Sequence, residues 1–323
     1  MGGEHNPVAK YISGYDIIGD VHGHARKLRA LIAQLGYVQS AGTWHHPEGR
    51  RVIFVGDLID RGPEQMEAVK LARSMVESGI AVCIMGNHEY NALLHSFGYR
   101  ELKDKDPHKS FLKEVPKESP EYRECLDWFM TLPLWYETED VFAVHACPDA
   151  ESMQTLQSVG MGPDNRLNEH ILTLAGLGRS APHGTKEKAV YDAFETILKG
   201  IEIDLPEGVS FVDKDGTERH TMRVRWWDGA ADTYRKAAFM THPEVLPDIK
   251  LADPITPCIP GKPVFIGHYW LAPSASKQPM AENIVCVDYS AGKGGPLVAY
   301  RWTKGDAMLS AEHFVVYNGP GVE

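Results

Sequence analysis

The sequence predicts an α/β sandwich, and three features of the chain support this. The first half alternates short apolar runs with longer segments of helical period. Two later apolar runs continue the pattern, and the end of the chain has the alternation and glycine-rich turns of antiparallel strands. Because successive strand–helix–strand units pair in parallel with right-handed crossovers, we expect a mainly parallel α/β core.

In the N-terminal part, strands alternate with amphipathic helices. In the first helix, Leu28, Leu31, Ile32 and Leu35 fall on one face, and Gly36 is its stop signal. The expected elements are strand 15–20, helix 25–36, strand 51–57, helix 63–79 with Pro63 in its first turn, and strand 80–87.

Further strands are expected at 141–146 and 263–268, and the segments NIVCVDYS, GGPLVAYRW and EHFVVYN should form an antiparallel set. Between them we expect helices at 165–177 and 186–199. A hairpin at 209–227 should follow, turning at Asp215 and Gly216. We interpret residues 151–260 as an insertion that covers the core, within one domain spanning 1–323.

Composition excludes several classes of protein. The chain of 323 residues has 33 Lys and Arg against 44 Asp and Glu, a net charge of −11 that disfavours nucleic acid as a partner. The five cysteines are scattered without a CxxC pair, which favours a reducing compartment. No signal-peptide pattern and no apolar run of ~18 residues is present, so we expect a cytoplasmic protein with no membrane partner. The oligomeric state stays open.

Polar side chains follow each of five expected strands where the strand ends. The five segments are GDVHG at 19–23, GDLIDRG at 56–62, GNHE at 86–89, His145, and Gly267 with His268. Since the carboxyl ends of parallel strands face one crevice, we expect these side chains to converge there.

The residue types at these strand ends suit a dinuclear metal site. Asp, Asn and His are ligands for manganese, iron or zinc, and less suited to soft metals. Two ions ~3.5–4 Å apart can activate water and clamp the oxygens of a displacement at phosphorus, provided that one carboxylate bridges them. The six candidate ligands are Asp20, His22, Asp57, Asn87, His145 and His268.

These motifs, in this order and spacing, resemble the calcineurin-like metallophosphoesterases, and within them the phosphoprotein phosphatase branch. That branch includes serine/threonine phosphatases, bacteriophage-type phosphatases and bacterial diadenosine tetraphosphatases. The segment at 287–302 is similar to the closing segment of the family. The resemblance implies a four-layer α/β/β/α sandwich that hydrolyses phosphomonoesters by in-line attack of metal-bound hydroxide.

The resemblance also implies roles for individual residues. Asp20 and His22 would hold the first ion, Asp57 would bridge, and Asn87, His145 and His268 would hold the second. The ions are expected to be Mn²⁺, with iron or Zn²⁺ as alternatives. His88 would be the catalytic acid, oriented by Asp60, since a neighbouring carboxylate favours the imidazolium.

Arginines are expected to bind the substrate phosphate, together with Asn87. Arg61 offers a planar fork that matches two phosphate oxygens. A second arginine is usual in the family, and Arg223, Arg225 and Arg235 are the candidates; we assign the role to Arg225 and Arg235. The segment VRWWDG departs from the tryptophan–serine–aspartate sequence of the eukaryotic phosphatases, so their substrate preference does not transfer.

Two substrate classes and one inactive alternative stay open. The substrate is a phosphorylated protein or small phosphate, or else a dinucleoside polyphosphate. The third possibility is a scaffold that binds phosphorylated partners without catalysis. Trp226 and Trp227 suit base stacking, although packing of the insertion is the preferred interpretation.

Several residues near the motifs are expected to have only structural roles. Glu89 should support a loop or cap a helix, Cys147 should pack in the core, and Gly292–Gly295 with Lys293 should form a turn. Histidines outside the motifs are expected on the solvated surface: His24, His45, His46, His95, His108 and His183.

Overall fold

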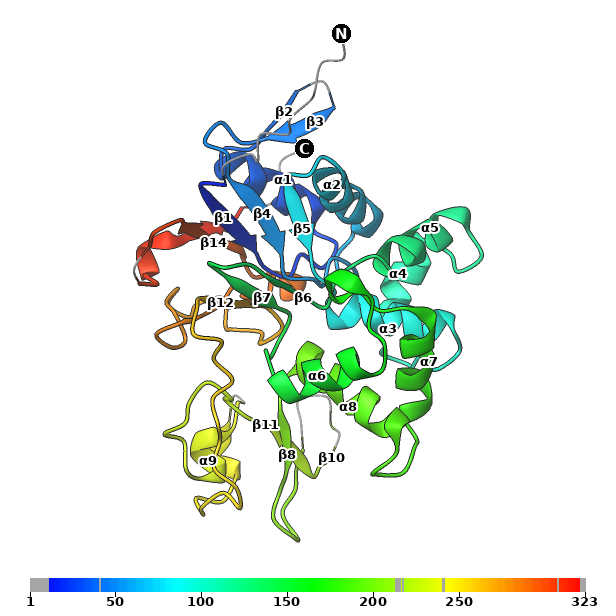
Figure 1. Cartoon of the computed structure of the whole chain (residues 1–323), viewed down its shortest axis with the longest axis vertical. Coiled ribbons are helices and arrows are strands. Elements are labelled where there is room, and N and C mark those ends of the chain that lie inside the picture. Colours follow the sequence, from blue (N-terminus) through cyan, green and yellow to red (C-terminus); the bar gives the residue numbers. More distant parts are fainter. Residues whose placement is uncertain are drawn as a thin grey trace.

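Two β-sheets form the centre of the computed structural model, which describes residues 12–40, 42–212, 216, 218–239, 242–306 and 308–319 (Figure 1). The first sheet has the order β15-β14-β1-β4-β5. Its strands are β1 (Gly14–Ile18), β4 (Arg51–Phe54), β5 (Ala81–Cys83), β14 (Leu297–Thr303) and β15 (Phe314–Tyr317). The three N-terminal strands pair in parallel and β14 and β15 are antiparallel, so the predictions for these strands are confirmed.

The second sheet has the order β13-β12-β7-β6. Its strands are β6 (Trp135–Glu137), β7 (Phe142–Val144), β12 (Val264–Ile266) and β13 (Ile284–Cys286). The prediction that the segment of β13 belongs to an antiparallel set is wrong, because β13 pairs in parallel with β12. The physical reason is burial: all three residues of β13 are buried, as is usual for parallel strands covered on both faces.

The two sheets pack face to face. Ile17 and Ile53 of the first sheet and Ala143 and Phe265 of the second belong to one buried apolar cluster. The opposite faces pack into a larger cluster with the helices, which gives the expected four layers. We expected the five polar strand ends to lie at the edge of one sheet. They belong instead to two sheets: β1, β4 and β5 to the first, and β7 and β12 to the second.

The helices α1 (Ala25–Gln34) and α2 (Gln65–Glu77) lie beside the first sheet (Figure 1). Leu28, Leu31 and Ile32 are buried on one face of α1, as predicted. Three helices between β5 and β6 were not predicted: α3 (Asn87–Ser96), α4 (His108–Glu114) and α5 (Pro120–Phe129). The first of these begins at Asn87, inside the segment expected as strand 80–87, because Gly86 ends the extended backbone and Glu89 caps the helix.

Between β7 and β12 the chain forms helices and short strand pairs. The two expected helices are found as α7 (Glu169–Gly178) and α8 (Lys186–Lys199), and α6 (Ala150–Ser158) precedes them. The remaining elements are β8 (Glu202–Asp204), β9 (Phe211–Val212), β10 (Glu218–Arg219), β11 (Thr221–Arg223) and α9 (Tyr234–Ala237); outside this region, β2 (Val38–Ser40) pairs with β3 (Thr43–His45).

The expected hairpin is found as the antiparallel pair β9 and β10, although Asp215 of its turn lies outside the described residues. The C-terminal part of the expected hairpin does not pair with its N-terminal part, because β11 pairs with β8 instead. Trp226 is fully buried and donates a hydrogen bond from Nε1 to the Tyr269 hydroxyl, 2.7 Å away, and Trp227 is also buried. The packing interpretation of both tryptophans is thus confirmed. No helix in the described part of the chain is long and apolar enough to cross a membrane.

A buried ion-pair cluster ties the first sheet together. Asp16 on β1 is fully buried and accepts hydrogen bonds from Arg50, Arg301 and the Tyr37 hydroxyl at 2.8–3.3 Å. Arg50 also donates to the backbone carbonyls of Tyr15 and Trp302. The cluster therefore joins β1, β14 and the residue before β4, while the other ends of β1 and β4 carry the polar motifs.

Removing Asp16 should destabilise the protein strongly, because the buried guanidinium of Arg50 would lose its counter-ion. We expect Asp16→Ala to lower the free energy of unfolding by about 3–5 kcal/mol, measured by urea denaturation. Glu67→Ala is the matched control, since it breaks only the exposed pair with Arg29 and should cost about 0–1 kcal/mol. Equal effects of the two substitutions would contradict this account.

Candidate functional site

The strand ends bring the predicted metal ligands together. Asp57 Oδ2 lies 3.8 Å from His22 Nε2 and 3.4 Å from His145 Nε2. Asn87 Oδ1 lies 3.1 Å from His145 Nε2 and 2.7 Å from His268 Nδ1. All six predicted ligands are buried: Asp20, His22, Asp57, Asn87, His145 and His268.

Glu89 fixes the two loops that carry Asp57 and Asn87. Its carboxylate is fully buried and accepts hydrogen bonds from the backbone N–H groups of Asp57, Leu58 and Gly86 at 2.8–3.0 Å. The expectation that Glu89 supports a loop and caps a helix is confirmed. A side chain at Gly86 would meet Asp57 Oδ1 at 2.2 Å, so only glycine allows this close approach of the loops.

Two groups of side chains have ligand atoms close enough to hold one cation each. The first group is His22, Asp57 and His88, and the second is Asp57, His145 and His268; within each, the ligand atoms lie within 4.8 Å of one another. Asp57 belongs to both groups, which is the position of a bridging ligand. His22 donates from Nδ1 to the Ile59 carbonyl at 3.0 Å, which leaves Nε2 as the atom that faces Asp57.

Asp20 is outside both groups, but it lies against the same centre. Its Oδ2 accepts the backbone N–H of His268 at 3.1 Å. Burial, followed by the charges of Asp288 and Asp57, raises the pKa of Asp20 well above its usual value. Such buried like charges favour a nearby cation.

The polar atoms left without partners test whether cations fit this site. Among the described residues, Asp20 Oδ1, His22 Nε2 and Asp57 Oδ2 are buried and lack a hydrogen-bond partner. Both ring nitrogens of His145 face oxygen atoms, with Nδ1 2.6 Å from the Val55 carbonyl and Nε2 3.1 Å from Asn87 Oδ1. Unpaired buried acceptors are costly, whereas divalent cations satisfy them, so these donor atoms fit a metal centre.

His88, a member of the first group, is also paired with a carboxylate outside it. Its Nδ1 donates to Asp60 Oδ2 at 2.5 Å, and its Nε2 lies 3.8 Å from Asp57 Oδ2. Burial opposes the charged ring, but the carboxylates of Asp57 and Asp60 outweigh it and raise the pKa of His88 above the ordinary value.

His108 joins this arrangement, and the expectation that it lies on the surface is wrong. It is buried, and its Nδ1 lies 3.1 Å from the second carboxylate oxygen of Asp60, so Asp60 is shared by two histidines. Among the other histidines outside the motifs, His45 and His183 are exposed as expected, while His24, His46 and His95 are partly buried. No local pattern marks His108, because it lies 48 residues from Asp60 in the chain.

Of the predicted phosphate-binding arginines, Arg61 lies at the centre and two others do not. The guanidinium carbon of Arg61 lies 4.1 Å from the ring centroid of Trp270, and Trp270 in turn lies beside His22. Arg225 donates to the Lys236 carbonyl, and Arg235 to the Leu246 carbonyl.

Arg223, the third candidate, contacts a predicted metal ligand. Its Nη1 lies 3.0 Å from His268 Nε2, and its Nη2 donates to Glu202 at 2.9 Å. The structure therefore brings Arg61 and Arg223 to the site, and it places Arg225 and Arg235 in bonds within the insertion.

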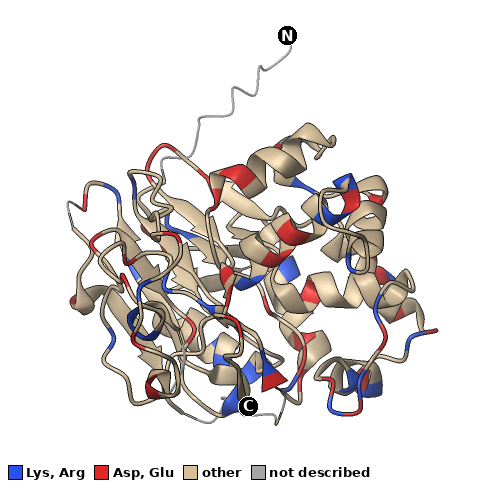
Figure 2. Ribbon diagram, turned by 90° about the horizontal axis from the view of Figure 1, so that it is seen from below, with Lys and Arg blue, Asp and Glu red and all other residues tan. Residues whose placement is uncertain are grey.

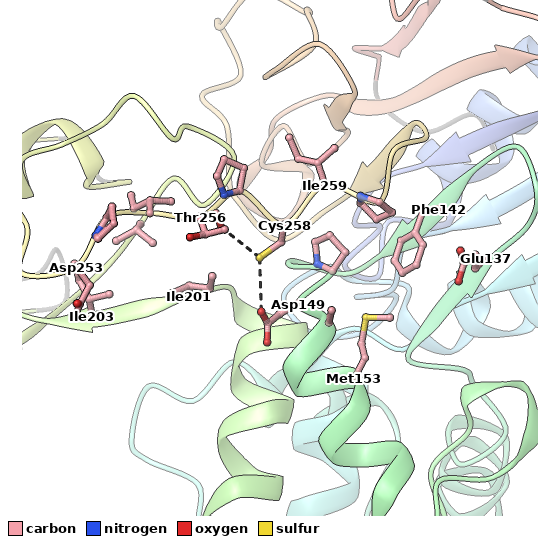
Figure 3. A pocket seen from close by; sticks show the side chains of 17 residues that line it. Glu137, Phe142, Asp149, Met153, Ile201, Ile203, Asp253, Thr256, Cys258 and Ile259 are labelled. Atoms are coloured by element: carbon pink, nitrogen blue, oxygen red, sulfur yellow. Dashed lines mark hydrogen bonds between the residues drawn. The ribbon is translucent and has the colours of Figure 1, made fainter.

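A separate cavity of about 710 Å³ lies between α6, β8 and the segment 253–260 (Figure 3). Its walls are apolar, as at Met153 and Ile203, and Cys258 donates to Asp149 across it, with Sγ 3.6 Å from Oδ1. The described residues that line it include acidic side chains and no lysine, arginine or histidine. This cavity is therefore unsuited to a phosphate group.

Figure 2 shows acidic and basic residues interspersed over the molecule.

Comparison with curated proteins finds relatives among bacterial nucleotide hydrolases. The chain is 49% identical over 74 residues to the asymmetrical bis(5'-nucleosyl)-tetraphosphatase PrpE of Halalkalibacterium halodurans, covering 23% of this chain and 30% of that protein. It is 32% identical over 146 residues to a symmetrical bis(5'-nucleosyl)-tetraphosphatase of a Marinomonas species, covering 43% and 48% of the two chains. The chain thus matches less than half the length of either relative.

Among solved structures, the chain is similar to a cold-active protein tyrosine phosphatase of a Shewanella species, with 17% identity, a TM-score of 0.49, and coverage of 95% and 80% of the two chains. A serine/threonine phosphatase of Saccharomyces cerevisiae gives 14% identity, a TM-score of 0.48, and coverage of 98% and 82%.

The family model described as calcineurin-like phosphoesterase matches residues 15–204, more than half of the chain. The chain therefore belongs to the calcineurin-like phosphoesterase family.

Proposed function

We propose that this chain is a phosphoesterase with two divalent metal ions that hydrolyses phosphomonoesters, and that Mn²⁺ is its preferred metal. The observation that carries the proposal is the set of unpartnered, buried ligand atoms around Asp57, with the His88–Asp60 pair beside them. Asp57 is the bridging ligand in this proposal. His22 and Asp20 serve one ion, and Asn87, His145 and His268 serve the other.

When bound, the metal ions supply an activated water and neutralise charge on the phosphoryl oxygens. Arg61 and Arg223 hold the remaining phosphoryl oxygens. His88 donates its Nε2 proton to the oxygen of the leaving group, and Asp60 keeps the ring oriented and stabilises its positive charge.

A dinucleoside tetraphosphatase is the second candidate function. The curated relatives carry this activity in their names, although they match less than half of this chain. The same centre serves both reactions, because each displaces an oxygen from phosphorus. A panel of p-nitrophenyl phosphate, phosphopeptides and diadenosine tetraphosphate with Mn²⁺ separates the two, and AMP plus ATP as products would indicate asymmetric cleavage.

Asp57→Asn should abolish metal-dependent turnover, because an amide is a poor bridge between two cations. We expect kcat to fall by more than about 100-fold and the number of bound ions, measured by plasma emission spectrometry, to drop below two per chain. Activity near that of the unmodified chain in a metal-replete assay would contradict the dinuclear proposal.

His88→Asn should lower kcat by about 10²–10⁴-fold while the metal content stays unchanged, because the substitution removes a proton donor. Metal content and turnover are measured on the same sample. His88 also belongs to one of the two groups that could hold a cation. Loss of metal together with activity would therefore show that His88 is a ligand.

The second phosphate-binding arginine can be identified by a matched pair of substitutions. Arg223→Met should raise KM for an aryl phosphate by about tenfold, because it removes a charged hydrogen-bond donor from the site. Arg235→Met is the control and should change KM less than about twofold, since Arg235 is bonded within the insertion. A larger effect of Arg235→Met would reverse the assignment.

A further inference from the structure

The turn that carries Lys293 lies directly against the proposed centre. It is a short 3-10 helix, Ala291–Lys293, between Ser290 and Gly294, whose φ angles are both positive. An added Cβ at Gly292 would lie 2.6 Å from the His22 ring and 2.8 Å from the Arg61 side chain. The turn therefore contacts both a proposed metal ligand and the proposed phosphate-binding arginine. The sequence predicted the turn but not these contacts.

Trp270 brings two cationic side chains to the same place. The guanidinium carbon of Arg61 lies 4.1 Å from the ring centroid of Trp270, and the ammonium nitrogen of Lys293 lies 4.3 Å from it. Trp270 is partly buried and Lys293 is exposed. Both cations therefore contact the same ring, with Arg61 partly buried and Lys293 exposed to solvent.

One buried carboxylate holds both the backbone of Trp270 and the start of the turn that carries Lys293. Asp288 Oδ2 accepts the backbone N–H of Trp270 at 2.8 Å, and Oδ1 accepts the backbone N–H of Ser290 at 2.9 Å. Lys27 closes the other end of the turn by donating to the Gly295 carbonyl at 2.8 Å. The backbone that carries Lys293 is therefore held in place before any ligand binds.

We propose that Lys293 and Trp270 form a second phosphate subsite, which binds the phosphate next to the one that is cleaved. The inference rests on the proposed function, because it places the cleaved phosphoryl group at the metal centre beside Arg61. The ligand class is a polyphosphate chain, as in nucleoside or dinucleoside polyphosphates. A lone phosphomonoester is held by Arg61, Arg223 and the ions and does not need Lys293.

The charges around this subsite favour a phosphate over other anions or bases. Arg61 and Lys293 both carry positive charge, and an ammonium group binds phosphate oxygens as a point charge without a fixed orientation. A polyphosphate has its next negative charge one bridging oxygen away, which suits two neighbouring cations. Trp270 gives the subsite an aromatic surface that both cations contact.

The experiment compares Lys293→Met with Lys277→Met in the chain of 323 residues with Mn²⁺. Lys277 is the matched control, because its ammonium nitrogen also lies over an aromatic ring, 4.4 Å from the Tyr289 centroid, but it donates to the Pro273 and Ala275 carbonyls. Affinities for inorganic phosphate and methylenediphosphonate are measured by titration calorimetry. Values of kcat/KM are measured with p-nitrophenyl phosphate, ADP, and peptides that carry one or two phosphates.

We expect Lys293→Met to weaken methylenediphosphonate binding and ADP hydrolysis by roughly five- to twentyfold, with less than about a twofold change for phosphate and p-nitrophenyl phosphate. Lys277→Met should change none of these. Equal losses on single and double phosphates, or no loss, would overturn the subsite. A defect confined to the doubly phosphorylated peptide would overturn the assignment to polyphosphate chains.

Failure of the proposed function is distinguishable from failure of this inference. An unmodified chain that hydrolyses none of these substrates would contradict the proposed function. The binding comparison between phosphate and methylenediphosphonate needs no turnover, so it decides on the subsite in either case.

Discussion

The carboxylate of Glu89 is the constraint on which the rest of the site depends. It accepts backbone N–H groups from the end of β4 and from Gly86 after β5, in a fully buried position. Without it these groups would be buried and unpaired, at about 1–3 kcal/mol each. Burial and the charge of Asp57 raise the pKa of Glu89 to about 7, while the backbone hydrogen bonds favour its charged form. Glu89 therefore holds together the two loops that carry Asp57 and Asn87.

Backbone strain is concentrated at the same place. Most of the described non-glycine residues with positive φ lie in or beside the site: His22, Asp57, Asp60, Arg61, His268, Trp270 and Ser290. Such conformations cost about 1–3 kcal/mol each and persist where surrounding contacts enforce them. Those contacts are visible here: the Asp60 N–H donates to Gln65 Oε1 at 2.6 Å, and Asp288 holds Trp270 and Ser290. The strained backbone positions therefore coincide with the residues that form the site.

The sequence was informative where chemistry follows a strand and much less so elsewhere. Apolar runs that end in Asp, Asn or His predicted both the parallel strands and the convergence of the ligands, because strand direction fixes where these ends meet. Parallel pairing of β13 was missed, since a short buried run has no periodicity that reports its partner. His108, Asp288 and Trp270 act through contacts between distant segments, and no spacing rule marks them. The sequence also does not distinguish between the arginines of the insertion. Arg223 and Arg225 are two residues apart, yet Arg223 contacts His268 and Arg225 donates to the Lys236 carbonyl.

Under the proposed function, cation binding and anion binding are coupled at this site. Asp20, Asp57 and Asp288 are buried together, and as charged groups they would repel a phosphate through a medium of low dielectric constant. Cations held by the same carboxylates reverse the sign of that field. Coupling between two ligands is reciprocal, so a substrate that binds better to the metal-loaded chain must also tighten metal binding. Arg61, which contacts Trp270, and Arg223, which contacts His268, add positive charge near these carboxylates. In a chain with a net charge of −11, the proposed binding of a phosphorylated substrate would depend on this local reversal of charge and not on the overall field of the protein.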